Sequence, residues 1–265
     1  MGIVNVTPDS FADGGLHADP NAAFAHARRL LDEGADLLDI GGESTRPGAA
    51  EIDENEEARR VLPLIERLAD CGKPVAVDTR KPEVMRRAIA AGASMINDVN
   101  ALRAPGAIEA VADSQLAVCL MHIQGEPATM QISPSYRDVV DEVLSFLGQR
   151  LDACRQAGIA DRRLVVDPGF GFGKTVEHNL ELLRNLQRFA ELGVPLLAGL
   201  SRKGMIGKLS GRPVGERVSG SVAAALAAVT RGAAIVRVHD VAATVDALAI
   251  WQAAALGPAF AAPSH

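Results

Sequence analysis

Eight short apolar runs recur along the chain, and each leads into a residue suited to chemistry. These residues are Asn5, Asp39, Asp78, Asn97, His122, Asp167, Ser201 and Arg237. Segments with the spacing of amphipathic helices lie between the runs, and strands that alternate with helices form parallel sheets through right-handed crossovers. Because polar groups are costly inside a core, their position at the ends of the runs predicts one polar rim.

A closed (β/α)8 TIM barrel, built as a single domain, is the fold that this pattern predicts. The competing architecture is an open doubly wound sheet, which concentrates functional residues at its switch point rather than at nearly every strand end. The length of 265 residues is close to the size of about 250 that is typical of such barrels. We expect the barrel to span residues 1–256 and residues 257–265 to form a flexible tail.

Helices are expected at 20–31, 54–70, 82–91, 105–112, 136–157, 176–189, 215–230 and 241–254. In the first of them, Asp19 can cap a helix that begins with Pro20, and Gly34 supplies the stop. Pro63 lies inside the second, and we expect a kink or a break there because proline donates no backbone hydrogen bond.

Composition excludes several classes of function. The formal net charge of −6 argues against a general nucleic-acid binder, which would usually carry a basic patch. The sequence has no run of 18 or more apolar residues, so no membrane span is expected. The N-terminus also lacks the pattern of a signal peptide. Cys71, Cys119 and Cys154 are scattered, so we expect small core or surface residues in a reducing cytoplasm. Cys119 lies inside an apolar run, which argues against a catalytic thiol.

Four residues at or near the ends of the apolar runs suit a flat heterocyclic ligand. Asp78, Asn97 and Asp167 end the third, fourth and sixth runs, and Lys203 follows the seventh. A barrel would bring these ends around one cavity, where two carboxylates, an amide and an ammonium can match an edge of alternating donors and acceptors. The alternative is that each aspartate caps the following helix, as Asp78 could before Pro82.

The eighth run leads into residues that suit an anion. Arg237 and His239 alternate in phase, so both should point the same way, and together they predict a cationic grip. Phosphate sites of eight-fold barrels often lie after strands seven and eight. The alternative is a surface ion pair of Arg237 with Asp240 or Asp246.

Polar loops follow the first and second runs, at 9–15 and 43–48, and could close over the site as lids. Thr45 and Arg46 in the second loop offer several donors for an anion, although an ordinary connection is the alternative. The segment Asp167–Lys174 reads DPGFGFGK, and its alternating glycines would let the backbone approach a ligand closely. It lacks the spacing of a phosphate-binding loop. His122 ends the fifth run without an evident partner in the sequence.

Taken together, these segments resemble the dihydropteroate synthase family. The resemblance covers Gly2 to about Trp251 and rests on Gly2–Phe11, Gly41–Gly48, Val77–Thr79, Ile96–Asp98, Asp167–Lys174, Ser201–Lys203 and Arg237–Asp240. It implies a transferase of folate biosynthesis. Such an enzyme joins a dihydropterin-methyl diphosphate to 4-aminobenzoate and releases diphosphate and 7,8-dihydropteroate.

The resemblance also implies roles for individual residues. The pterin would be held by Asp78, Asn97, Asp167 and Lys203. The diphosphate would be met by Asn5, Thr45, Arg46, Arg237 and His239, and Asn5 would also bind the cofactor Mg²⁺. The 4-aminobenzoate pocket, where sulfonamide drugs act in the family, would be shaped by Phe11, Thr45, Pro47 and Ser201. The catalytic set would be Asp78, Asp167, Lys203, Arg237 and His239. Dimerisation is common in the family, and the Ala-rich last two helices lead us to expect a homodimer.

The residue chemistry agrees with this role, because loss of diphosphate needs anion stabilisation and exclusion of water. The attacking amine belongs to the substrate, so no Ser or Cys nucleophile is needed. Two alternatives stay open: a pterin-binding methyltransferase barrel that serves a corrinoid protein, and a non-catalytic paralogue. Arg80 departs from the family pattern, since a small polar residue is more usual there, and it adds a cation near Asp78.

Overall fold

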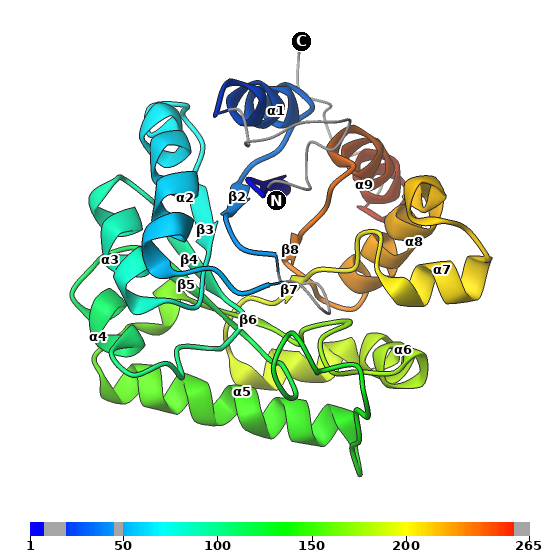
Figure 1. Ribbon diagram of the computed structural model, residues 1–265. Coiled ribbons are helices and arrows are strands. Elements are labelled where there is room, and N and C mark those ends of the chain that lie inside the picture. The colour runs from blue at the N-terminus through cyan, green and yellow to red at the C-terminus, as the bar shows by residue number, and fades with distance from the viewer. Residues whose placement is uncertain (8–19, 45–49, 257–265) are drawn as a thin grey trace.

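Residues 1–7, 20–44 and 50–256 are described by the computed structural model. In these ranges one α-helix follows each of eight strands, except that two helices follow the seventh strand (Figure 1). The strands are β1 (Gly2–Asn5), β2 (Leu38–Gly41), β3 (Val75–Asp78), β4 (Met95–Asp98), β5 (Ala117–Met121), β6 (Leu164–Asp167), β7 (Leu197–Ala198) and β8 (Ile235–Val236). The helices are α1 (Pro20–Asp32), α2 (Glu54–Leu68), α3 (Pro82–Ala90), α4 (Ala107–Ala112), α5 (Val139–Gln156), α6 (Val176–Arg184), α7 (Gly204–Ser210), α8 (Val218–Val229) and α9 (Val241–Leu256).

The strands form a parallel barrel with the helices outside it (Figure 1). Strands β1 to β6 make one sheet in sequence order, and β7 pairs with β8. Parallel bridges between Val166 and Leu196 and between Gly2 and Val238 join these two sheets at both edges. The predicted (β/α)8 barrel is therefore confirmed, and the open doubly wound sheet is wrong.

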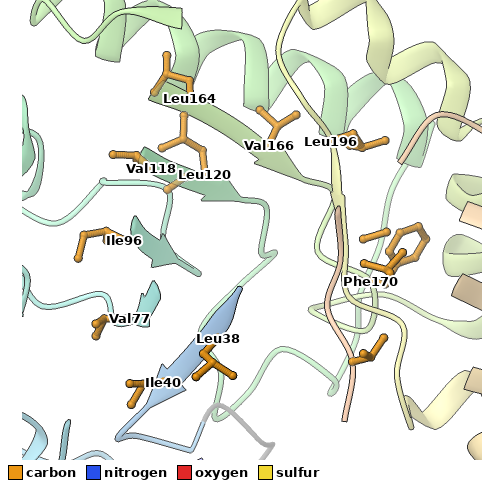
Figure 2. Packing of buried hydrophobic residues seen from close by; sticks show 14 of the residues in the cluster. Leu38, Ile40, Val77, Ile96, Val118, Leu120, Leu164, Val166, Phe170 and Leu196 are labelled. Carbon is orange, nitrogen blue, oxygen red and sulfur yellow. The ribbon is translucent and has the colours of Figure 1, made fainter. Parts of the chain in front are cut away.

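Alternation along the strands separates the apolar core from the site. Buried side chains such as Leu38, Ile96 and Val166 point toward the helices and belong to the large core shown in Figure 2. The residues between them point into the barrel. Their apolar members form a separate small cluster of Ala76, Met95, Cys119, Val165 and Leu197. Above this cluster, the next inward positions are the polar strand ends, because side chains on a strand repeat every two residues.

Most helices lie where the sequence predicts them, with two informative differences. Helix α2 continues through Pro63, so of the expected kink or break, the break does not occur. Pro63 has no N–H to donate to the carbonyl of Arg59, four residues earlier. Both residues are exposed, so water can donate to that carbonyl instead. Helix α7 was not predicted; it is short and begins directly after Lys203.

The cysteines behave as packing residues. Cys119 and Cys154 are buried free thiols, and Cys71 is half-buried. Burial raises the pKa of the Cys119 thiol well above its ordinary value, so the thiol stays protonated at neutral pH. Over the part of the chain that the structure describes, no helix combines the length and apolarity that a membrane span requires.

Candidate active site

Polar side chains from different strands gather around two glycines, one ending β2 and one directly after β7. A Cβ on Gly41, at the end of β2, would lie 3.7 Å from Asn5 Oδ1 and 4.0 Å from Asp78 Oδ2. After β7, a Cβ on Gly199 would lie 3.8 Å from Asp167 Oδ2 and 3.9 Å from the Cβ of Arg237. The side chains of four strands thus converge over the carboxyl end of the barrel.

Arg237 joins the two predicted halves of the site. Its Nη2 donates to Asp78 Oδ2 at 2.9 Å, and its Nε donates to Asp39 Oδ2 at 2.5 Å. Burial lowers the pKa of Arg237, but the two carboxylates outweigh burial, and the pKa lies above its ordinary value. The alternative of a surface ion pair with Asp240 is wrong, because Asp240 binds Arg202 instead.

Asp39 ends the second apolar run in the sequence, but its role in the site was not predicted. The carboxylate is fully buried and accepts from Asn97 Nδ2 at 3.2 Å as well as from Arg237. In the sequence, the second run is given a role only through the polar loop at 43–48 that follows it. However, β2 continues to Gly41, so Asp39 lies inside the strand, two positions before Gly41 and on the same inward face. A charged residue between Leu38 and Ile40 was the available signal.

The pKa of Asp78 is raised to about 7. Desolvation is the largest cause, Arg237 opposes it, and the negative charge of Asp39 adds to it. Asp78 therefore titrates near neutral pH in the unliganded site. It does not cap the next helix: Lys81 is the N-cap of α3, and its backbone N–H donates to Thr79.

Asn97 lines the floor pocket and holds an unsatisfied acceptor. The residue is 5% exposed, and its Oδ1 is buried without a hydrogen-bond partner among the described residues. A buried acceptor without a partner is costly, so a ligand donor at this position would be stabilising. The neighbouring Asp98 faces the other way and accepts from the backbone of Asn100 and Leu102.

Asp167 and Lys203 place opposite charges on the other side of the cavity. Asp167 Oδ1 accepts from the backbone N–H of Gly169 at 2.7 Å, and burial raises the pKa of its carboxyl. The pKa of Lys203 is lowered to about 8, by desolvation first and by Arg237 second. Its ammonium lies 4.0 Å from the centre of the Phe172 ring, a cation–π contact.

Ser201 and His239 form a hydrogen-bonded pair at the rim. Ser201 Oγ accepts from the backbone N–H of His239 at 3.1 Å and lies 3.0 Å from His239 Nδ1. The pKa of His239 is lowered to about 4 by desolvation and by Arg237. Burial beside a guanidinium therefore keeps the imidazole neutral in the unliganded site at neutral pH, so the fixed charge of the predicted cationic grip is that of Arg237.

The glycines of the segment 167–174 serve mainly the protein itself. A Cβ on Gly169 would lie 1.9 Å from the carbonyl oxygen of His122, and one on Gly173 would lie 2.3 Å from that of Gln124. Both glycines also have positive φ angles, +69° and +62°. The expectation that the glycines admit a ligand holds best for Gly171, which lines the main cavity beside Lys203.

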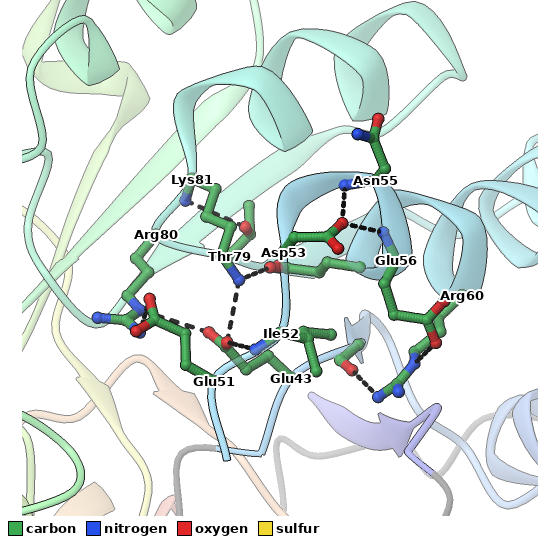
Figure 3. Close-up of polar contacts among 12 residues, drawn as sticks. Glu43, Glu51, Ile52, Asp53, Asn55, Glu56, Arg60, Thr79, Arg80 and Lys81 are labelled. Carbon is green, nitrogen blue, oxygen red and sulfur yellow. Dashed lines mark hydrogen bonds and ion pairs between the residues drawn. The ribbon is translucent and has the colours of Figure 1, made fainter. Parts of the chain in front are cut away.

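A partly buried charge cluster holds the base of the loop after β2 (Figure 3). Glu43 accepts from the backbone of Ile52 at 3.0 Å and from Lys81 at 2.9 Å, and Lys81 also binds the buried Glu57. Arg80 donates to Glu43 and Glu51. The positive charge of Arg80, which was expected near Asp78, is thus neutralised by Glu43 and Glu51 at the base of the loop.

Several predicted positions cannot be placed in the site. Phe11, Thr45, Arg46 and Pro47 lie outside the described residues, as do all of the loop 9–15, most of the loop 43–48 and the tail 257–265. The others line one open cavity of about 1650 Å³ or the small pocket at its floor. The cavity is lined by Asn5, Asp78, Ser201, Lys203, Arg237 and His239, and the floor pocket adds Asn97 and Asp167. This volume exceeds the roughly 300–1,000 Å³ of common ligand pockets, so two small substrates can fit.

No group of three or more His, Cys, Asp or Glu side chains suited to a metal occurs within residues 1–7, 20–44 and 50–256. Asn5 instead offers one amide oxygen on the cavity wall, close to Asp78 and on the same side as Arg237. Mg²⁺ commonly takes few protein ligands and completes its shell with water and substrate phosphates. The residues present therefore fit Mg²⁺ if a phosphorylated ligand brings most of the oxygens.

Comparison with known proteins agrees with this geometry. The family model described as "Pterin binding enzyme" matches residues 1–239. The dihydropteroate synthase of Haemophilus influenzae is 51% identical over 258 residues, which cover 96% of this chain and 93% of that protein.

Two solved structures from Xanthomonas albilineans are similar as well. A dihydropteroate synthase with 4-aminobenzoic acid is 61% identical with a TM-score of 0.92, and the match covers 97% of this chain and 93% of that one. A second, in complex with 7,8-dihydropteroate, is 58% identical with a TM-score of 0.88 over the same shares. The chain therefore belongs to the dihydropteroate synthase family of pterin-binding transferases.

Proposed function

We propose that this chain joins (7,8-dihydropterin-6-yl)methyl diphosphate to 4-aminobenzoate and releases 7,8-dihydropteroate and diphosphate. The observation that carries the proposal is the convergence of Asp78, Asn97, Asp167, Lys203 and Arg237 on one pocket floor. It is supported by relatives that bind 4-aminobenzoic acid and 7,8-dihydropteroate. The arginine and histidine after β8 favour it over a methyltransferase, which has no diphosphate to bind.

The pterin ring would lie on the floor pocket. Its amino and ring N–H groups would donate to the carboxylates of Asp78 and Asp167 and to the unsatisfied Oδ1 of Asn97, while Lys203 would donate to a ring acceptor. Filling the buried acceptor of Asn97 removes a desolvation cost that the unliganded site carries. The two carboxylates also face the ring on which positive charge develops.

The diphosphate would lie toward the rim, beside Arg237 and His239. A bound diphosphate favours the charged form of a neighbouring imidazole, so it should raise the pKa of His239 from about 4. His239 can then donate to the leaving group through Nε2 while Ser201 holds Nδ1 at 3.0 Å. Arg237 supplies a fixed charge on the same face.

In the proposed reaction, the bond between the pterin methylene carbon and the diphosphate oxygen breaks, and its electron pair leaves with diphosphate. The ring stabilises the resulting cation. The lone pair of the 4-aminobenzoate amine then forms the new carbon–nitrogen bond, and the amine loses one proton. Asp78 and Asp167 orient the ring and offset its charge, and Arg237 and His239 stabilise the departing anion.

Mg²⁺ is the proposed cofactor, with Asn5 as its protein ligand. When bound, the ion would neutralise charge on the diphosphate as it leaves. Thr45 and Arg46 would add diphosphate contacts. Phe11, Thr45, Pro47 and Ser201 would shape the 4-aminobenzoate pocket.

The chain is also proposed to act as a homodimer in the cytoplasm. Apolar side chains on α9 support the dimer, since Ile250 is 74% exposed and Val245 is 37% exposed. A second copy covering α9 would bury this surface. Sedimentation at micromolar concentration tests the proposed homodimer, and a monomeric protein would contradict this part of the proposal.

The activity is tested by incubating the purified protein with Mg²⁺ and each substrate alone or both together. Dihydropteroate and stoichiometric diphosphate are expected when both substrates are present. Arg237→Ala should weaken diphosphate binding, and Asp78→Asn should weaken pterin binding. Absence of dihydropteroate with both substrates would overturn the proposed function, and unchanged affinities in both variants would overturn the site assignment.

A further inference from the structure

Lys174 is a buried ionisable residue that the proposed reaction does not use. The residue is 3% exposed, and its ammonium group has three donors. They meet His122 Nδ1 at 2.9 Å, the carbonyl of Gly169 at 2.9 Å and the carbonyl of Phe172 at 3.0 Å. All three partners are neutral, although burying a charge is costly unless it is paired as well as hydrogen-bonded.

His122 is held as a neutral acceptor for this ammonium. Its pKa is lowered to about 2, by desolvation first and by the charge of Lys174 second. The imidazole therefore carries its proton on Nε2 and leaves the Nδ1 lone pair for Lys174. The ring of Phe146 packs edge-on against His122 with ring centres 4.9 Å apart, which fixes the orientation of the imidazole.

The two carbonyls that Lys174 binds belong to a loop that carries two parts of the site. At one end, the backbone N–H of Gly169 donates to Asp167 Oδ1 at 2.7 Å. At the other end, Phe172 places its ring 4.0 Å from the ammonium of Lys203. The ammonium of Lys174 binds the carbonyls of both Gly169 and Phe172 and so fixes the turn between them. The contact of Gly169 with Asp167 and that of Phe172 with Lys203 are fixed with the turn.

Charge gives Lys174 a second influence on Asp167. Burial raises the pKa of the Asp167 carboxyl, and the positive charges of Lys203, Arg237 and Lys174 oppose that effect. Reciprocally, desolvation lowers the pKa of Lys174 to about 7, and Asp167 is the neighbour that raises it. A neutral side chain of the same size would fill the space but would lose this interaction.

We propose that Lys174, with His122 as its acceptor, is a positioning residue for the reaction, fixing the loop of residues 168–173 so that Asp167 and Phe172 face the substrates. The inference rests on the proposed function, because it assumes that Asp167 binds the pterin. It assigns a role to His122 and to residues 168–174, for which the reaction itself gives none.

Three variants and one control test the proposal. Lys174→Met removes all three donors at similar volume, and His122→Leu leaves one ammonium hydrogen without a partner. His122→Asn is the conservative rescue, because its amide oxygen can occupy a position close to that of Nδ1. Lys73→Met makes the same chemical change on the surface, where the side chain is 47% exposed. For each protein, calorimetry gives the Kd of a pterin that lacks the diphosphate, and steady-state kinetics give kcat and both KM values.

Lys174→Met and His122→Leu should weaken pterin binding at least about tenfold. Their kcat should fall by about 100-fold, since a displacement of about 1 Å in positioning has effects of this size. His122→Asn should recover most of both losses relative to His122→Leu, and Lys73→Met should match the wild type. A loss of melting temperature without a change in pterin Kd or kcat would show a merely structural role and overturn the proposal.

If Lys174→Met fails to fold, the comparison of His122→Asn with His122→Leu decides the question. Equal pterin affinity and equal kcat in that pair, with both proteins folded, would overturn the inference. Failure of the proposed function is distinguishable, because then the wild type itself would make no dihydropteroate. The contrast in pterin affinity would still test the positioning role.

Discussion

Replacing Asp39 with asparagine removes one negative charge from the floor of the site at nearly constant volume. Asp39 is fully buried, and its Oδ2 accepts from Arg237 at 2.5 Å and from Asn97 at 3.2 Å. A hydrogen bond to a charged group contributes about 1.5–3 kcal/mol, and Arg237 keeps its bond to Asp78. We expect the free energy of unfolding to fall by about 2–3 kcal/mol, or roughly 5–10 °C in melting temperature.

The same substitution should shift the pH dependence of the reaction. The pKa of Asp78 is raised to about 7, chiefly by desolvation, and Asp39 adds to the rise. Without the charge of Asp39, the pKa of Asp78 falls, so Asp78 stays ionised to lower pH. Because kcat/KM reports ionisations of the free enzyme, its acid limb should move to lower pH while its plateau decreases.

The assay is the pH profile of kcat/KM for the pterin diphosphate, together with differential scanning calorimetry. Asp36→Asn is the matched control, since that carboxylate is 91% exposed and should show neither effect. A wild-type acid limb and a wild-type melting temperature in Asp39→Asn would refute the reasoning. A lower melting temperature with an unmoved limb would refute the electrostatic part alone.

Three further predictions concern the loop after β6, its neighbour His122, and Arg80. Gly169→Ala should cost well over the roughly 1–2 kcal/mol of a left-handed residue, because its Cβ would lie 1.9 Å from the His122 carbonyl oxygen. Gly193→Ala, with nothing within 4 Å, should cost only about that amount in urea unfolding. Since the folded pKa of His122 is lowered to about 2 from 6.5, the unfolded chain binds an extra proton between these values, and stability falls as pH falls. His122→Asn should remove a slope of up to about 1.4 kcal/mol per pH unit from stability measured near pH 6 to 4. Arg80→Ala should leave the pterin Kd within about twofold, because Arg80 is bound by loop carboxylates; a tenfold change would contradict its placement.

The fold could be predicted because the sequence shows both the short apolar runs of strands and the spacing of amphipathic helices. Short apolar runs with polar ends indicate strands, and the helical spacing between them indicates parallel connections. Barrel closure followed from the even distribution of polar ends, and the bridge between Gly2 and Val238 bears it out. The helix α7 escaped prediction because its seven residues hold two glycines and lack a side-chain cap.

The site was predicted in part, for reasons of the same kind. Asp78, Asn97 and Asp167 end or nearly end their strands, so a rule about strand ends finds them. Asp39 ends an apolar run in the sequence but lies mid-strand in the structure, one layer below the strand ends, so its contact with Arg237 was not predicted. The neutral state of His239 depends on burial beside Arg237, which spacing along the chain does not reveal.

The central claim is that the inward-facing positions of the strands form the pterin site while their outward neighbours form the core. Calorimetric titration of a pterin into Asn97→Ala and into Ile96→Val tests it most directly, because these adjacent residues of β4 face opposite sides of the barrel wall. We predict that Asn97→Ala weakens the Kd by at least about tenfold, the loss of one buried hydrogen bond, and that Ile96→Val leaves it within about twofold. Wild-type affinity in Asn97→Ala, or an equal loss in both variants, would contradict the account.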